Sequence, residues 1–390
     1  FTITSAANAV NVDAIDFTHV SAIDAGSGAG DSVVASGSAV NAELTSSNNG
    51  LTASTIDFSN INNADLNGGE LTGTNGNDET FTIDNDANEV NVNAINFTQV
   101  SAIDAGTSAN DAIVTTVAVD ATLTGTDNAV DASGIAFTNV NTADLNTGTL
   151  LGSANADVFA LDAAGLIANQ ILFTAINSLV DAQGGADDVT GMVGIDWTLT
   201  ADNGALSSTP YQFVNIETAD LVNQSLTGTD ANSETFTITT ADNAVNVNAI
   251  DLVQVSAINA GTSANDEIIV TGSAVNAALT SSDNGLTASN IAFSNINDVA
   301  LNNGELTGTN VDNETFTIGA DANEVNVNAI DFTQVSAINA GSSEEDAIVV
   351  AGTAVNAELT SSDNELTASG IAFSNINDVA LNNGELTGTN

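Results

Sequence analysis

The side chains able to do chemistry in this chain are almost all carboxylates. Its 390 residues include 50 Asp and Glu and one His, with no Lys, Arg or Cys, and the formal net charge is −50. Acidic residues recur in and beside Gly-rich turns, and hard oxygen ligands of this kind suit Ca²⁺. The alternative is that these turns are solvated and only keep the protein soluble. The candidate calcium ligands are Asp24, Asp31, Asp78, Asp104, Asp111, Asp181, Asp187, Asp188, Asp266 and Asp346.

Two of these turns have a recognisable pattern, LTGTNGNDETF at residues 71–81 and DAQGGADDVTG at residues 181–191. They resemble the Gly- and Asp-rich nonapeptides of RTX proteins, and the resemblance implies Ca²⁺ held between paired turns by carboxylates and backbone carbonyls. The RTX site forms between consecutive nonapeptides, whereas here the motifs stand alone. The matching residues are Gly184, Gly185, Asp187, Asp188 and Val189, followed by Gly76, Asp78 and Phe81.

Catalysis is not expected from these residues. Glycoside hydrolysis needs a converging carboxylate pair, but the carboxylates here recur with a repeat, and no basic residue is present to shift a pKa by pairing. His19 aligns with Gln99 and Gln334 in repeated copies of one motif, which indicates a variable surface position. No Ser/His/Asp set, Cys nucleophile or phosphate loop is present, so we predict a protein that is not an enzyme.

The charge also restricts partners and location. Without basic residues the chain cannot neutralise phosphate, which excludes nucleic acid and anionic membrane surfaces as partners. No apolar run long enough to span a membrane occurs. Self-repulsion at this charge is relieved by salt or metal, so a saline extracellular or cell-surface location is expected. Apolar residues make up 43% of the chain and recur in register, which predicts a folded protein with a buried core.

The chain is built from repeats with a period of about 40 residues, paired into units of about 80. The predicted units are residues 1–80, 81–158, 159–235, 236–315 and 316–390, of which the third is divergent and holds the only Met, Trp, Pro and Tyr. Because the sequence begins within a motif, we expect a window of a longer repetitive protein. The shorter period is anchored at Phe17, Phe58, Phe97, Phe137, Phe173, Phe213, Leu252, Phe293, Phe332 and Phe373.

Short β-branched segments between Gly, Ser, Asn and Asp turns predict strands rather than helices. Tandem immunoglobulin-like sandwiches would also repeat near 80 residues, but they have no reason to repeat at half that length. A β-solenoid does, because each coil copies the one below it. We therefore predict an all-β, continuous β-solenoid with coils of about 20 residues, about 20 of them in this chain. An Asn-on-Asn ladder is predicted at Asn60, Asn139, Asn215, Asn295 and Asn375.

The F-x-x-V/I-x-x-I/L and LTGT-x-x-x-x-(D/E)-x-F patterns resemble repeat regions of bacterial surface proteins. These include giant RTX-type adhesins, filamentous-haemagglutinin-like exoproteins and acidic surface-layer proteins. The resemblance implies a secreted, non-enzymatic shaft of an adhesin or of a biofilm-matrix filament, with Ca²⁺ as a candidate cofactor. Its partners would be further copies of itself, joined head to tail or laterally, or cell-surface and matrix components. The alternatives are a calcium-dependent surface-layer lattice and a carbohydrate- or ice-binding face.

Overall fold

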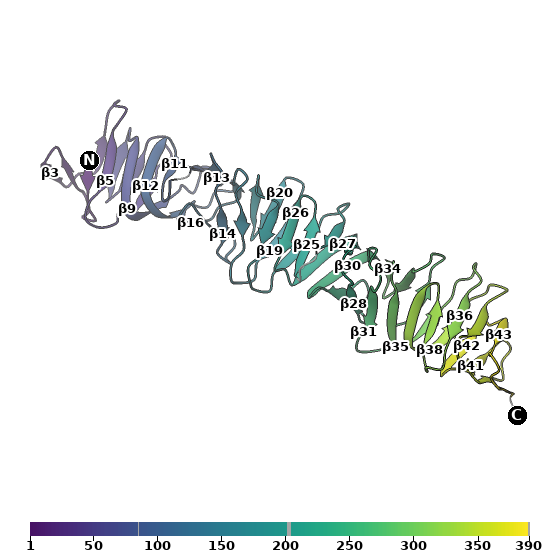
Figure 1. Cartoon of the computed structure of the whole chain (residues 1–390). Coiled ribbons are helices and arrows are strands. Elements are labelled where there is room, and N and C mark those ends of the chain that lie inside the picture. Colours follow the sequence, from purple (N-terminus) through teal and green to yellow (C-terminus); the bar gives the residue numbers. More distant parts are fainter. Residues whose placement is uncertain (85, 201–203, 389–390) are drawn as a thin grey trace. The chain divides into compact units, whose positions relative to one another are not determined.

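The computed structural model describes residues 1–84, 86–200 and 204–388, and this part of the chain contains strands and turns but no helix. It confirms the predicted β-solenoid: stacked parallel coils, about 12 turns in all (Figure 1). The predicted coil length was wrong. Strand partners lie about 32 residues apart, as in Thr80 with Ala112 and Thr315 with Ala347, instead of about 20.

The chain divides into two compact units, which we describe separately. Unit 1 comprises Phe1–Val189 and Phe213–Asn215, and unit 2 comprises Thr190–Gln212 and Ile216–Asn390. The strands of unit 1 are β1 (Thr2–Ile3), β2 (Ala9–Val12), β3 (Ile15–Thr18), β4 (Ala22–Asp24), β5 (Ser32–Ala35), β6 (Ala42–Leu44), β7 (Leu51–Ala53), β8 (Ile56–Ser59), β9 (Asn63–Thr72), β10 (Thr80–Ile83), β11 (Val90–Val92), β12 (Ile95–Asp104), β13 (Ala112–Thr115), β14 (Ala121–Leu123), β15 (Val130–Ala132), β16 (Ile135–Thr138), β17 (Thr142–Asp144), β18 (Leu150–Leu151), β19 (Val158–Asp162), β20 (Gly165–Ala168), β21 (Ile171–Thr174) and β22 (Leu179–Asp181).

Strands β23 (Asp188–Thr190) and β26 (Tyr211–Val214) contribute residues to both units. The strands of unit 2 are β24 (Trp197–Leu199), β25 (Ala205–Ser208), β27 (Thr218–Thr227), β28 (Thr235–Ile238), β29 (Val245–Val247), β30 (Ile250–Asn259), β31 (Glu267–Val270), β32 (Ala277–Leu279), β33 (Leu286–Ala288), β34 (Ile291–Ser294), β35 (Asp298–Thr307), β36 (Thr315–Ile318), β37 (Val325–Val327), β38 (Ile330–Asn339), β39 (Ala347–Val350), β40 (Ala357–Leu359), β41 (Leu366–Ala368), β42 (Ile371–Ser374), β43 (Asp378–Ala380) and β44 (Leu386–Thr387).

The strands bury alternate residues, as their sequence pattern predicts. In β8 the buried residues are Ile56 and Phe58, and β10 buries Phe81 and Ile83 while its threonines point outward. The inward Phe, Ile, Leu and Val side chains fill the interior of each coil. Phe rings from different coils meet there, with centroids 6.1 Å apart for Phe81 and Phe137 and 6.4 Å apart for Phe316 and Phe373. The repeated aromatic positions therefore form the core.

Two ladders of strands, which we name ladder A and ladder B, run along unit 1. Ladder A stacks β1, β5 and the first halves of β9 and β12 in parallel, then passes through β11 and β10 to β13, β17 and β21. From β21 it continues through β20 and β19 to β23. Ladder B joins β4 to β8, then continues through β7, β6, the second halves of β9 and β12, and β16. From β16 it passes through β15 and β14 to β18 and β22. The ten-residue strands β9 and β12 thus belong to both ladders.

Unit 2 repeats this arrangement. Its ladder A contains β28, β31, the first halves of β35 and β38, β37, β36, β39 and β43. Its ladder B contains β34, β33, β32, the second halves of β35 and β38, and β42, β41, β40 and β44. Gly304 is required at the bend in β35, because a Cβ there would lie 1.9 Å from the Val275 carbonyl oxygen.

Antiparallel meanders explain why the sequence repeats every 40 residues and the coils every 32. Each meander consists of three consecutive antiparallel strands, in which two hairpins share the middle strand. Examples are β10–β11–β12 and β14–β15–β16, and each meander adds two strands to one ladder. Successive meanders alternate between the ladders, so each ladder receives one for every 80-residue unit. The Phe anchors lie on the third strand of successive meanders, as with Phe58 on β8, Phe97 on β12 and Phe137 on β16.

Candidate functional site

The predicted calcium ligands fall into groups that make different contacts. Asp24, Asp104 and Asp181 are at least partly exposed and end strands of ladder B, where each accepts a side-chain hydrogen bond from an Asn one coil further on. The donors are Asn60, Asn139 and Asn215, each at 2.7 Å. The hydrogen bond from Asn60, followed by that from the Gly26 N–H, lowers the pKa of Asp24. These carboxylates therefore accept hydrogen bonds from neighbouring coils of the solenoid.

The predicted Asn-on-Asn contact is confirmed in unit 2 and is wrong in unit 1. The five asparagines do not stack on one another, since each pairs with the residue that ends the strand of the preceding coil, an Asp in unit 1 and an Asn in unit 2. In unit 2 the partners are Asn259 for Asn295, at 2.6 Å, and Asn339 for Asn375, at 2.7 Å.

A second group of predicted ligands is buried. Asp111, Asp187, Asp266 and Asp346 have no exposed surface and immediately precede strands of ladder A, and Asp31 holds the same position beside β5 but is half-buried. One oxygen of each buried Asp accepts the backbone N–H of an acidic residue one coil earlier. These donors are Glu79 (2.8 Å), Asp157 (2.7 Å), Glu234 (2.8 Å) and Glu314 (2.9 Å).

Asparagine side chains extend this series of contacts into the following coil. The backbone N–H groups of Asp111, Asp266 and Asp346 donate to the side-chain oxygens of Asn141 (3.0 Å), Asn297 (3.2 Å) and Asn377 (3.1 Å). Asp31 donates in the same way to Asn62 at 3.3 Å. We name this run of Glu, Asp and Asn over three successive coils the polar column. Its side chains satisfy the backbone at a corner of each coil.

The glutamates of the polar column were not among the predicted site residues. Glu79, Glu234 and Glu314 are buried, and each accepts a hydrogen bond from the hydroxyl of a Thr five residues earlier. The donors are Thr74 (2.6 Å), Thr229 (2.5 Å) and Thr309 (2.6 Å). The LTGT-x-x-x-x-(D/E)-x-F pattern contains both partners, so the signal was present. What the pattern does not show is the buried Asp one coil away.

Wherever the polar column occurs, a Glu carboxyl and an Asp carboxyl lie together without a cation. Burial raises the pKa of Glu79, Glu234 and Glu314, and the hydrogen-bonding contact with the neighbouring Asp raises it further, against the lowering effect of the Thr donors. Glu234 Oε2, Glu314 Oε2, Asp266 Oδ2 and Asp346 Oδ2 are buried without a hydrogen-bond donor. Two ionised carboxylates cannot bond to each other, whereas one proton shared between them supplies the donor. The arrangement is suited to holding a proton.

The predicted calcium ligands are spread along the chain. Among the described residues no three or more Asp, Glu or His side chains form a group that could hold a metal ion. Asp78 lies on the surface, bonded by Ser108 (3.0 Å) and Asn110 (3.1 Å), and Asp188 is exposed. Ca²⁺ takes about 6 to 8 oxygen ligands. Calcium binding by the ten Asp residues stays a prediction.

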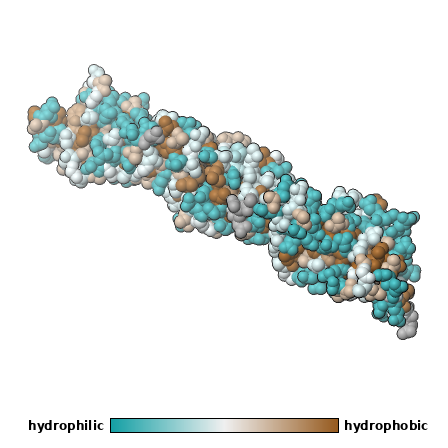
Figure 2. Space-filling view, in the orientation of Figure 1, coloured by the Kyte–Doolittle hydropathy of each residue, from teal (hydrophilic) through white to brown (hydrophobic). Residues whose placement is uncertain are grey.

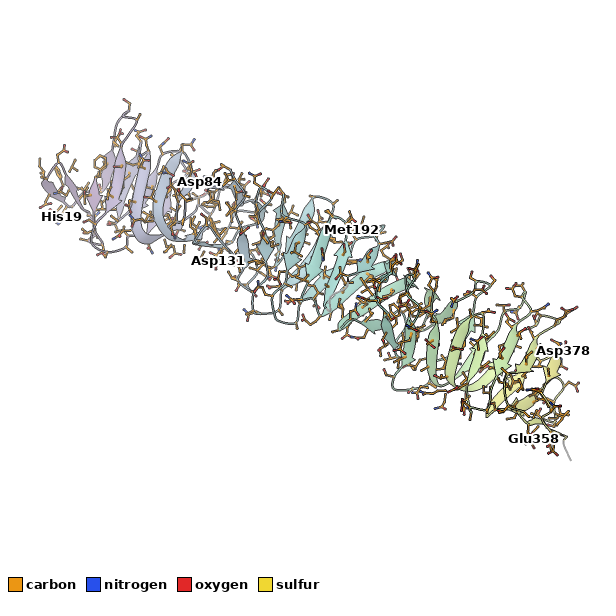
Figure 3. The ribbon with its side chains drawn as sticks, in the orientation of Figure 1. His19, Asp84, Asp131, Met192, Glu358 and Asp378 are labelled. Carbon is orange, nitrogen blue, oxygen red and sulfur yellow. The ribbon has the colours of Figure 1, made fainter. Side chains whose placement is uncertain are left out.

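Other residues that could mark a site lie apart from the polar column. His19 is exposed at one edge of unit 1, beside the Thr18 hydroxyl at 3.3 Å, and Figure 3 shows it away from the labelled Asp84 and Asp131. Trp197 is fully buried and Tyr211 is buried, so the aromatic residues of the divergent repeat belong to the core. Surface hydrophobic residues are interspersed with hydrophilic ones within each unit (Figure 2).

Comparison with protein-family models, curated proteins and solved structures gives no match. Within the ranges that the structure describes, no helix has the length and hydrophobicity needed to cross a membrane.

Proposed function

We propose that this chain is a non-enzymatic structural region, the shaft of a bacterial surface adhesin or of an extracellular matrix filament. The observation that carries this proposal is that the polar groups of the chain serve its own coils. The acidic side chains recur from coil to coil as acceptors for backbone N–H groups, as in Glu234 with Asp266 and Glu314 with Asp346, and do not converge on one place.

The chemistry of the surface supports an extracellular role. A net charge of −50 without Lys or Arg keeps copies apart at low salt and leaves no cleavage site for trypsin-like proteases. Load along the coils would be carried by the parallel backbone ladders and by the buried Phe contacts between coils. The proposed mechanism is mechanical: the region holds a binding tip away from the cell or links cells within a matrix.

Two alternatives remain as proposals of lower rank. A surface-layer lattice would use the same repeats laterally and would need Ca²⁺ to assemble. A carbohydrate- or ice-binding face would need outward Thr-x-Thr pairs in successive coils. The register does not supply them at β36, because Thr315 and Thr317 stack on Ala347 and Val349 of β39. The same break occurs at β10, where Thr80 and Thr82 stack on Ala112 and Val114.

Immunogold labelling of intact cells of the source organism, with antibodies raised against this chain, tests the proposal. We expect label along filaments or projections outside the cell. Deleting one 80-residue unit from the full-length protein should shorten the projections while leaving their attachment intact. Label confined to the cytoplasm would overturn the proposal. A continuous surface lattice that dissolves in EDTA would favour the surface-layer alternative.

A further inference from the structure

The outer face of ladder A in unit 2 contains two grooves at equivalent positions of the repeat. The first lies on the meander β28–β29–β30 and has a volume of about 420 Å³, and the second lies on the meander β36–β37–β38 and has a volume of about 330 Å³. Both volumes are within the range of ligand pockets, about 300–1,000 Å³. Neighbouring strands flank both grooves, since β30 pairs with β27 and β36 pairs with β39.

The floor of each groove is a row of one Thr, one Asn and one Asp on three neighbouring strands. In the first groove Thr237 lies opposite Asn246, and Asn246 lies opposite Asp251. The counterparts in the second groove, in the same register, are Thr317, Asn326 and Asp331. We name each of these sets a Thr–Asn–Asp row. The same polar floor therefore occurs twice in unit 2, at positions 80 residues apart.

A hydrogen bond inside each row determines which polar atoms remain for a ligand. Asn246 Nδ2 donates to Asp251 Oδ1 at 2.7 Å, and Asn326 Nδ2 donates to Asp331 Oδ1 at 2.6 Å. The acceptors that remain in each row are the Asp Oδ2, the Asn Oδ1 and the Thr hydroxyl oxygen. A lysine ammonium group has three N–H donors and no acceptor. Each Thr–Asn–Asp row thus offers one acceptor for every donor of an ammonium group.

Apolar surface beside each row suits the stem of a lysine side chain. Val253, which is 45% exposed, and Ala244 line the first groove, and Ala351 and the methyl-bearing Thr333 line the second. Lysine packs its four methylene groups along apolar surface while its charged end reaches polar groups. The grooves therefore match a whole lysine side chain and not the ammonium group alone.

The same geometry disfavours the other cations that acidic surfaces attract. Arginine binds a carboxylate best with its planar fork on both oxygens, and one oxygen of each Asp already accepts a bond from Asn. Ca²⁺ takes about 6 to 8 oxygen ligands, which is more than one row supplies. A second copy of the chain cannot provide the cation, because the sequence contains no Lys or Arg. The occupant is a lysine of another protein.

We propose that an extended, lysine-containing segment of a partner protein binds along ladder A of unit 2, with one lysine side chain in each groove. The strands of Asp251 and Asp331 are five strand spacings apart, through β29, β28, β31 and β35 (Figure 1). At about 4.8 Å for each spacing, the two carboxylates are about 24 Å apart. The partner's two lysines must span this distance.

The charge between the grooves complements such a segment. Glu267 and Asp298 lie there in register with Asp331, on neighbouring parallel strands. Burial, followed by the charges of Asp331 and Glu267, raises the pKa of Asp298, so these carboxylates repel one another without a cation. The same row in unit 1 is uncharged and consists of Ser32, Asn63 and Asn96. The coils do not require carboxylates at these positions, which favours a role in binding a cationic partner.

Calorimetric titration of the chain with synthetic peptides at physiological ionic strength tests the spacing and the choice of lysine. The probe is a Ser/Thr peptide with blocked ends and two lysines eight residues apart, which spans about 27 Å when extended and places both side chains on one face. We expect it to bind at least tenfold more tightly than a peptide with adjacent lysines, which reaches one groove only. Replacing both lysines by arginine should weaken binding at least fivefold. Equal affinities for these peptides, or no binding, would overturn the proposal.

A pair of double variants separates the grooves from the general charge of the chain. Asp251→Asn with Asp331→Asn removes the carboxylate of each row, and Asn96 shows that the fold accepts Asn at this position. We expect the two-lysine peptide to bind this variant at least tenfold more weakly. The control, Asp283→Asn with Asp312→Asn, removes the same charge from exposed turns and should bind within twofold of the unmodified chain. Equal losses in both variants would mean that net charge alone attracts the peptide.

The grooves and the shaft role can fail separately. Peptide binding by a protein that immunogold finds only in the cytoplasm would refute the shaft and support the grooves. Labelled projections outside the cell, together with a chain that does not bind the two-lysine peptide, would refute the grooves and leave the shaft.

Discussion

The backbone N–H of Glu234 donates to Oδ1 of Asp266 at 2.8 Å, which places two buried carboxyls from successive coils in contact. Glu314 and Asp346 repeat this relationship at 2.9 Å. A chain with 50 acidic residues and no Lys or Arg has no cation for such a pair. The stability of the solenoid should therefore depend on whether each pair holds a proton.

The first prediction concerns pH. Because the pKa values of Glu79, Glu234 and Glu314 are raised in the folded state, their stabilising contribution is complete below the usual value of 4.5 and is lost as pH rises through the raised values. Thermal melts followed by circular dichroism should show a higher Tm near pH 5 than at pH 7. Asp24 acts in the opposite direction, since its pKa is lowered. A Tm that falls steadily from pH 7 to pH 5 would contradict this prediction.

The second prediction separates the carboxyl pairs from the general charge of the chain. Glu234→Gln and Glu314→Gln mimic the protonated state, because the amide can donate to the neighbouring Asp and still accept from Thr229 or Thr309. Each should raise stability at pH 7, by about 1–3 kcal/mol for a satisfied buried oxygen, and should flatten the pH dependence. Exposed Glu344→Gln removes the same charge and serves as the control. Equal effects of the three substitutions would mean that only net charge matters.

The third prediction concerns an asparagine brace that the sequence did not reveal. Asn284 has φ of 56° and donates from Nδ2 to the carbonyls of Ile296 (2.9 Å) and Ala329 (3.0 Å), joining two coils. Asn49, Asn88, Asn243 and Asn323 make the equivalent bonds. Asn284→Ala should cost about 2–3 kcal/mol from the lost bonds and the left-handed backbone, measured by local hydrogen exchange.

Asn284→Gly is the control for this brace. It tolerates the backbone conformation and removes only the side-chain bonds, so it should cost less than Asn284→Ala. If both variants exchange hydrogen like the unmodified chain, the brace contributes nothing to stability.

The fourth prediction uses one motif position in two environments. Phe332→Ala empties a fully packed site and should cost about 3–5 kcal/mol, whereas Phe17→Ala removes a side chain that is already partly exposed and should cost much less. Denaturant unfolding of each variant measures the difference. Similar losses at both positions would show that residues 15–24 are already covered in solution.

Much of this fold could be predicted from the sequence, because alternating apolar residues and turn residues determine strands locally. The coil length could not, because the 40-residue recurrence counts meanders and each meander places two extra strands in the same ladder. A local signal for those hairpins exists: Asn93 and Ala94 both have positive φ, at 49° and 60°, between the paired Val92 and Ile95. The burial of Glu234 could not be predicted either, since it depends on which coil lies above it.

The fifth prediction concerns calcium, the ion that the acidic turns suggested. The described residues bring no three acidic side chains together in a metal-binding group, so added Ca²⁺ should act mainly by screening the charge of −50. Ca²⁺ and Mg²⁺ at equal millimolar concentration and ionic strength should then raise the Tm by similar amounts, and EDTA should change little at fixed ionic strength. A stabilisation specific to Ca²⁺ and saturating at low millimolar concentration would show that oxygens of the turns form true sites. In that case Asp78→Asn and Asp188→Asn, which alter exposed predicted ligands and leave the polar column intact, should each reduce the calcium-dependent gain.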